Sequence, residues 1–231
     1  ALIDQATGER VRGAEDFAVD RRRGLLYVAA YDRRAVERAV SRRALSVPQG
    51  GVYITPLAAL FDPTADEASV APMLRPQDVA GGLRPHGISF DPATGEAAFI
   101  NRAYNRLNGG WAMTPRVERA GVNGAVYVGA ARPAPCSANS LLEEGGRTLV
   151  SFDHGECGWR AGLEDMFRLK RSGVAAADGE VLFAGAAFAN GLARTHDGHL
   201  ALAATRENAV LLMRSKAEGL VETGRIDLPG G

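Results

Sequence analysis

Four polar residues recur at matching points of four similar segments of the chain. They are Glu15, His86, Asn139 and Asn190. Carboxylate and amide oxygens are ligands that Ca²⁺ prefers, whereas Zn²⁺ is usually held by imidazole or thiolate groups in a tight tetrahedron. Glu15, Asn139 and Asn190 therefore predict a calcium site if the fold brings them together, and further ligands are needed to complete it.

Each of these residues opens a unit that reads as strand, turn and strand. The units span residues 13–32, 84–103, 136–155 and 188–208, and each has a turn rich in Gly and Asp between two partly apolar runs. Such a pattern is typical of β-hairpins. Further short strands are expected at 50–57, 124–131, 179–187 and 208–215.

The spacing of these units predicts the fold. A repeat of about 50 residues with four short strands is the length of a propeller blade. A β-sandwich also has many short strands, but it would not repeat one polar residue at the same point of each unit. The prediction is an all-β protein, a β-propeller. The first strand of every blade starts at the same end of the central channel, so the four polar residues would face one another there.

The domain organisation follows from the same count. Residues 1–231 are expected to form a single propeller domain with about four blades, and propellers close with typically four to eight. The chain ends on glycines just after a strand, so the C-terminal blades are expected to be missing. Short helices or decorated loops are expected at 32–44 and 159–170, and residues 101–122 are expected to form a long connection.

Composition narrows the classes of partner. The chain has 27 Lys and Arg against 27 Asp and Glu, so it lacks the basic charge that nucleic acids attract. No apolar run reaches the roughly 18 residues that cross a bilayer. The residues after Ala1 lack the basic start and apolar stretch of a signal peptide.

The two cysteines bear on the compartment. Cys136 and Cys157 flank one expected hairpin, so a disulfide between them is favoured. A disulfide indicates an oxidising, extracytoplasmic or secreted location. Two buried thiols in a cytosolic protein are the alternative, and a zinc site is not expected because CxxC spacing is lacking.

Five short motifs carry a resemblance to a known family. They are GAED at 13–16, RPHGISFD at 84–91, SAN at 137–139, DHG at 153–155 and FANG at 188–191. In this order the motifs resemble those of the paraoxonase/arylesterase family, and the likeness extends to gluconolactonases and strictosidine-synthase-like proteins. The resemblance implies a six-bladed propeller with two calcium ions in its central tunnel.

The resemblance also implies roles for particular residues. Glu15, Asn139 and Asn190 would bind the catalytic calcium ion, while Asp16 and the carbonyl of Ile88 would bind a structural one. His86 would belong to a histidine pair that activates water. His154 would lie in the tunnel beside the metal.

Three departures from the family pattern qualify these roles. Ser140 stands where the family usually has an Asp, which weakens or deletes the structural calcium site. The second histidine of the pair is expected near Asn101, Arg102 and Ala103, none of which is histidine. The remaining calcium ligands of the family belong to a blade beyond Gly231.

The chemistry implied is hydrolysis of lactones or aryl esters, in which calcium polarises the carbonyl and water attacks it. His86 is the expected base, because histidine exchanges protons near neutral pH. A non-catalytic, calcium-stabilised propeller that binds a ligand or protein is the second hypothesis. A lyase of the strictosidine-synthase kind is the third, and Glu15 counts against it. Expected partners are a small ester or lactone, together with a homo-oligomer or a missing C-terminal segment that covers the open blades.

Overall fold

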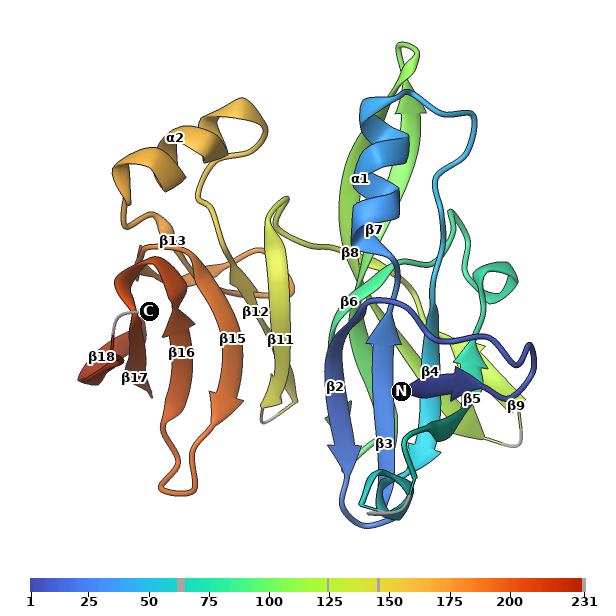
Figure 1. The fold of residues 1–231 in the computed structure, drawn as a ribbon. Helices are drawn as coiled ribbons and strands as arrows, with labels where there is room; N and C mark the ends of the chain where they lie inside the picture. Colours follow the sequence, from blue (N-terminus) through green and yellow to red (C-terminus); the bar gives the residue numbers. More distant parts are fainter. Residues whose placement is uncertain (62–64, 124, 145, 230–231) are drawn as a thin grey trace. The chain divides into compact units, whose positions relative to one another are not determined.

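The computed structural model describes residues 1–61, 65–123, 125–144 and 146–229. The predicted end of the domain, Gly231, and the start of the expected strand at 124–131, Gly124, lie outside these described residues. The chain forms two compact units, Ala1–Ala131 and Arg132–Gly231 (Figure 1). Each unit contains two β-sheets with a hydrophobic core between them.

The first sheet of the first unit is an antiparallel meander of four strands with a fifth strand added in parallel. Its strands are β1 (Leu2–Asp4), β2 (Ala14–Asp20), β3 (Leu25–Ala30), β4 (Gly51–Pro56) and β5 (Ala68–Leu74). The second sheet contains β6 (Pro85–Asp91), β7 (Glu96–Leu107), β8 (Gly110–Asn123) and β9 (Ala125–Val128), paired antiparallel in that order. A four-stranded meander is the topology of a propeller blade.

Alternation of apolar residues along β3 explains how the two sheets meet. Tyr27 and Ala29 point into a core shared with the second sheet, where Leu74 and Phe99 are fully buried. The rings of Tyr27 and Phe90 stack with their centroids 5.2 Å apart. Burying side chains of this size contributes about 1.5–3 kcal/mol each, which holds β2 and β6 in a fixed relation.

Three helical segments connect the strands of the first unit: α1 (Arg33–Ser41), η1 (Leu57–Leu60) and η2 (Pro76–Asp78). Helix α1 begins after Asp32, whose carboxylate accepts a hydrogen bond of 2.8 Å from the backbone N–H of Ala35. This cap satisfies one of the free N–H groups at the start of the helix.

The second unit repeats the meander twice. One sheet has the order β11 (Ala138–Glu144), β12 (Arg147–Phe152), β13 (Ser172–Ala176) and β14 (Val181–Ala186). The other has the order β15 (Ala189–Arg194), β16 (Leu200–Ala204), β17 (Ala209–Lys216) and β18 (Gly219–Asp227). Leu202, Leu211 and Met213 are fully buried between these sheets. The remaining elements are β10 (Arg132–Pro133), α2 (Trp159–Phe167) and η3 (Thr205–Glu207).

The structure confirms the four predicted hairpins, and of the two possibilities for 32–44 and 159–170 it has a short helix in each segment. It corrects the expectation of a long connection at 101–122, because β7 and β8 form a long hairpin there. The turn is Asn108–Gly109, and both residues have positive φ angles, 49° and 77°. Asn-Gly is the sequence signal for such a two-residue turn, but it lies within a segment whose polar and aromatic residues hide the alternation of the strands.

Candidate functional site

All four repeated polar residues lie where the strand register is irregular. In each blade the first strand pairs regularly with the second except near its start, between Ala14 and Asp16 in the first blade. The other irregularities fall between Pro85 and Ile88, Ala138 and Leu141, and Ala189 and Leu192. A register shift re-aims the side chains at that point, and such bulges are over-represented next to functional sites. The repeat read from the sequence is therefore a repeat of backbone geometry.

In the first unit, two of these residues are in contact. The Oε2 atom of Glu15 on β2 lies 3.3 Å from Nδ1 of His86 on β6, and their side chains are 18% and 7% exposed. Burial raises the pKa of Glu15, while the positive charges of Arg33 and Arg102 oppose the rise. A carboxylate in such a place favours a nearby cation.

Asp16 faces a different group from its neighbour Glu15. Its Oδ2 accepts a hydrogen bond of 3.0 Å from the backbone N–H of Ile88, and Oδ1 accepts one of 2.8 Å from the N–H of Phe17. Burial raises the pKa of Asp16, and these two hydrogen bonds oppose the rise. The carboxylate ties β2 to β6 at the register shifts, and it contacts the N–H of Ile88, whereas the predicted ligand is the carbonyl of that residue.

Two further residues join the Glu15–His86 pair and were not singled out from the sequence. The hydroxyl of Tyr31 lies 3.5 Å from Nδ1 of His86, and Nη1 of Arg102 donates to that hydroxyl at 3.4 Å. Burial raises the pKa of Tyr31, so its hydroxyl stays protonated. The resemblance expects the second histidine of the pair near Arg102, and this was the only sequence feature that pointed to a contact of Arg102 with the His86 group.

The residue beside Arg102 has a structural role. Asn101 is fully buried, and its amide donates to Glu118 at 3.0 Å and to the carbonyl of Gly82 at 2.9 Å. Its Oδ1 accepts from the N–H of Arg84 at 2.8 Å. Because these hydrogen bonds occupy both ends of the amide, Asn101 fixes the start of β6 next to His86.

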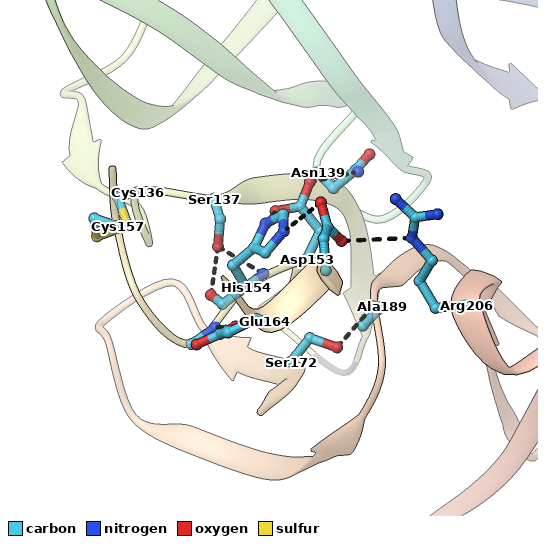
Figure 2. A network of polar contacts seen from close by, with 12 residues as sticks. Cys136, Ser137, Asn139, Asp153, His154, Cys157, Glu164, Ser172, Ala189 and Arg206 are labelled. Atoms are coloured by element: carbon cyan, nitrogen blue, oxygen red, sulfur yellow. Dashed lines mark hydrogen bonds and ion pairs between the residues drawn. A yellow bond between two sulfur atoms is a disulfide. The ribbon is translucent and has the colours of Figure 1, made fainter. Parts of the chain in front are cut away.

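In the second unit, Asn139 and His154 are joined through Asp153 (Figure 2). The Nδ2 atom of Asn139 donates to Oδ2 of Asp153 at 3.2 Å. Nδ1 of His154 lies 2.7 Å from Oδ1 of the same carboxylate. Nε2 of His154 lies 3.3 Å from Oδ2 of Asp165 on α2, an ion-pair contact without hydrogen-bond geometry. Both ring nitrogens of His154 therefore face carboxylates.

The backbone around Asn190 is fixed from several sides. Phe188 has a positive φ of 61°, a strained conformation for a bulky residue. Its ring meets that of His154 edge-on, with centroids 5.3 Å apart. The next residue, Ala189, donates its N–H to the hydroxyl of Ser172 at 2.8 Å (Figure 2). The carbonyl of Asn190 accepts a hydrogen bond from the hydroxyl of Ser151. Strain that the surroundings hold in place is often found at functional sites.

The predicted disulfide between Cys136 and Cys157 is formed. It closes the loop that carries His154, and the hydroxyl of Ser137 holds the same loop through the N–H and carbonyl of His154 (Figure 2). The disulfide is compatible with an extracytoplasmic location. Sequence reasoning did not find the roles of Ser137 and Asp165, because neither occupies a repeated position.

The donor atoms of the predicted calcium ligands have suitable chemistry. Glu15 brings a half-buried carboxylate, and the amide of Asn139 donates through Nδ2 so that Oδ1 is left as its acceptor. Within the described part of the chain, no three His, Cys, Asp or Glu side chains gather in a metal-binding group. Any ion held by the predicted residues would thus depend on amide oxygens as well as on carboxylates.

Comparisons with known proteins find structural likeness without sequence likeness. No protein-family model matches the chain, and no curated protein matches it. A chain of a nidogen/laminin complex aligns over 92% of this chain and 62% of its own, with a TM-score of 0.52 at 14% identity. The PQQ-bound aldose sugar dehydrogenase of Streptomyces coelicolor aligns over 88% and 61%, with a TM-score of 0.50 at 12% identity. A candidate gluconolactonase aligns over 88% and 60%, with a TM-score of 0.49 at 14% identity.

The chain has the β-propeller fold. The predicted fold class is thereby confirmed, with four blades in the chain. The chain spans 62% and 61% of the lengths of the first and second of these structures. The described helices are all too short and too polar to cross a membrane. Membership of the paraoxonase/arylesterase family stays a prediction, since identities this low show the fold alone.

Proposed function

We propose that this protein is a calcium-dependent hydrolase of lactones or aryl esters. One observation carries the proposal: Glu15 and His86 are in contact, 3.3 Å apart, at the register shifts of β2 and β6. The pair combines a carboxylate ligand for a hard cation with an imidazole that exchanges protons. In metal-assisted hydrolysis of an ester, the first group would hold the metal and the second would take a proton from the attacking water.

The residues that would hold the ion are Glu15, Asn139 and Asn190. All three offer oxygen atoms, which suits Ca²⁺ and does not suit Zn²⁺. When bound, calcium would supply positive charge that stabilises the oxyanion developing on the substrate carbonyl. Asp153 contacts both His154 and Asn139, so His154 would affect the reaction through the proposed ligand Asn139.

His86 is the proposed general base. The carboxylate of Glu15 and the hydroxyl of Tyr31 both face Nδ1, so they orient the ring and stabilise the proton that it takes from water. His154 is a poorer candidate for the base. Neither of its ring nitrogens faces a site for water, because each is directed at a carboxylate.

We propose a single calcium ion. Each oxygen of Asp16 already accepts a backbone hydrogen bond, and the one from Ile88 joins β2 to β6. Ser140 stands where the family's Asp is expected, and its N–H is bonded to the hydroxyl of Ser151. Coordination of a second ion by Asp16 and Ile88 remains a prediction.

The test joins calcium binding to hydrolysis. Titration calorimetry would measure calcium binding by the whole chain, while phenyl acetate and a simple δ-lactone are assayed with calcium and with a chelator. The proposal expects binding, and hydrolysis that stops on chelation and returns with added calcium. Failure to bind calcium would exclude the metallohydrolase. Hydrolysis that persists in chelator would exclude the role of the metal.

A non-catalytic calcium-binding propeller is the second candidate. It is favoured by Asn101, a buried structural residue near the position where the resemblance expects the second histidine. This candidate predicts calcium binding and a calcium-dependent rise in melting temperature with no hydrolysis of either substrate.

A further inference from the structure

A chain of charged and polar contacts runs from η3 to the candidate ligand Asn139 (Figure 2). Nε of Arg206 lies 3.4 Å from Oδ1 of Asp165, whose Oδ2 lies 3.3 Å from Nε2 of His154. Nδ1 of His154 lies 2.7 Å from Asp153, which accepts a hydrogen bond of 3.2 Å from Nδ2 of Asn139. All five residues belong to the second unit.

The last link decides which way the amide of Asn139 faces. An amide has a donor end and an acceptor end of nearly equal size, so its hydrogen bonds determine its orientation. The carboxylate of Asp153 can only accept when it is ionised, so it selects the Nδ2 end of Asn139. Oδ1 is then turned away from Asp153, as a calcium ligand requires.

Helix α2 directs its two acidic residues toward the loop that carries His154. The helix turns its acids inward: Glu164 is 5% exposed, and its carboxylate accepts from the N–H of Gly155 at 2.9 Å. Its large apolar residues point outward instead, with Trp159 75% and Met166 71% exposed. Glu164 and Asp165 therefore both contact the His154 loop, whereas the large apolar residues of α2 are not buried as they are in most helices.

We infer that Asp165 and Arg206 are positioning residues for Asn139, which hold its amide oxygen in place as a cation ligand. The inference rests on the proposed function for the identity of the ligand. Arg206 fixes Asp165, the two carboxylates fix the ring of His154 between them, and the ring fixes Asp153. Groups that orient a metal ligand from behind affect metal affinity strongly even though they do not touch the metal.

The first experiment measures calcium affinity by calorimetry in matched variants of the whole chain. Asp165→Asn keeps the size of the side chain but removes the charge that faces His154. Glu164→Gln, the control, removes the same charge from the neighbouring residue of α2 and keeps an acceptor for Gly155. We expect Asp165→Asn to weaken calcium binding about 10-fold or more. The calcium affinity of the control should stay within about two-fold of that of wild type. A change of this size would be the general electrostatic effect of removing one negative charge from α2. Equal losses in the two variants would overturn the inference.

The second experiment needs no metal. In the metal-free protein, the Nδ2 amide proton signals of Asn139 are assigned by NMR from their loss in Asn139→Asp. They should move in Asp165→Asn and in Arg206→Gln, stay in place in Glu164→Gln, and return toward their original positions in Asp165→Glu. A general loss of structure would move signals across the unit and would not be rescued by Glu.

The two experiments separate this inference from the proposed function. A wild-type chain that does not bind calcium refutes the proposed function, while the amide signals still report whether Asp165 orients Asn139. Amide signals that stay fixed in Asp165→Asn overturn the inference. So do signals that move while calcium affinity remains unchanged.

Discussion

The Oε2 atom of Glu15 lies 3.3 Å from Nδ1 of His86, although 70 residues separate the two positions in the chain. β2 and β6 belong to different sheets, and the core between these sheets holds them together. The contact joins a half-buried acid to the proposed base, so each side chain can be tested for a separate role.

Glu15→Gln should abolish calcium binding and hydrolysis together. The change keeps the shape of the side chain but removes the charge on the only carboxylate among the three proposed catalytic ligands. Calorimetry and the ester assay would be run on the same preparation. Asp197→Asn, a change at an exposed hairpin tip, is the control. Retained calcium affinity in Glu15→Gln would contradict the ligand assignment.

His86→Gln should lower turnover by about 10²–10⁴-fold, the usual contribution of a general base, and leave calcium affinity within about two-fold. Glutamine retains a polar group near Glu15 and Tyr31 but does not accept a proton from water. Steady-state kinetics with phenyl acetate would measure the loss. An unchanged turnover would move the role of base away from His86.

Glu118→Gln should stabilise the protein at neutral pH, because it removes a buried charge and keeps the acceptor for Asn101. Burial raises the pKa of Glu118 above its usual value, although its hydrogen bond from Asn101 and the charge of Arg116 oppose the rise. A raised carboxyl pKa favours the folded state at low pH, and this contribution is lost as pH rises through the folded-state pKa. The variant should therefore gain more in melting temperature at pH 8 than at pH 4.5. The reverse order of gains would show that the charged form is favoured.

Asn101→Ala should destabilise the first unit by about 2–4 kcal/mol, because it leaves several buried hydrogen-bonding groups without their partner. Urea unfolding followed by tryptophan fluorescence would measure the loss. Asn105→Ala, on the exposed part of the same strand, should change stability by less than about 0.5 kcal/mol. Similar losses in both variants would argue against a structural role for Asn101.

Replacing both cysteines, as Cys136→Ser with Cys157→Ser, should cost about 3 kcal/mol of unfolding free energy. The disulfide joins residues 21 positions apart and restricts the unfolded chain. Thermal unfolding of the variant should match that of wild type in a reducing agent. A variant as stable as oxidised wild type would show that Ser137 and α2 hold the loop unaided.

Local pattern was sufficient to predict most of the blades. The hairpins of Glu15, His86, Asn139 and Asn190 were all predicted, because strands, turns and their repeat are properties of neighbouring residues. The β7–β8 hairpin was missed because polar residues outside the core mask the alternation, and only Asn108–Gly109 indicated the turn. Polar residues repeated at strand starts were also visible in the sequence, and the register shifts explain why they recur.

The sequence by itself determined the fold class and the positions of the candidate ligands, since both follow from spacing along the chain, and it favoured a disulfide that the structure then showed. Only the tertiary structure decided the contacts of Glu15 with His86 and of Asp165 with His154. These contacts join residues on different elements, and their geometry depends on how the sheet cores and α2 pack. Such packing reflects the sum of many distant burial and hydrogen-bond energies, which no local pattern encodes.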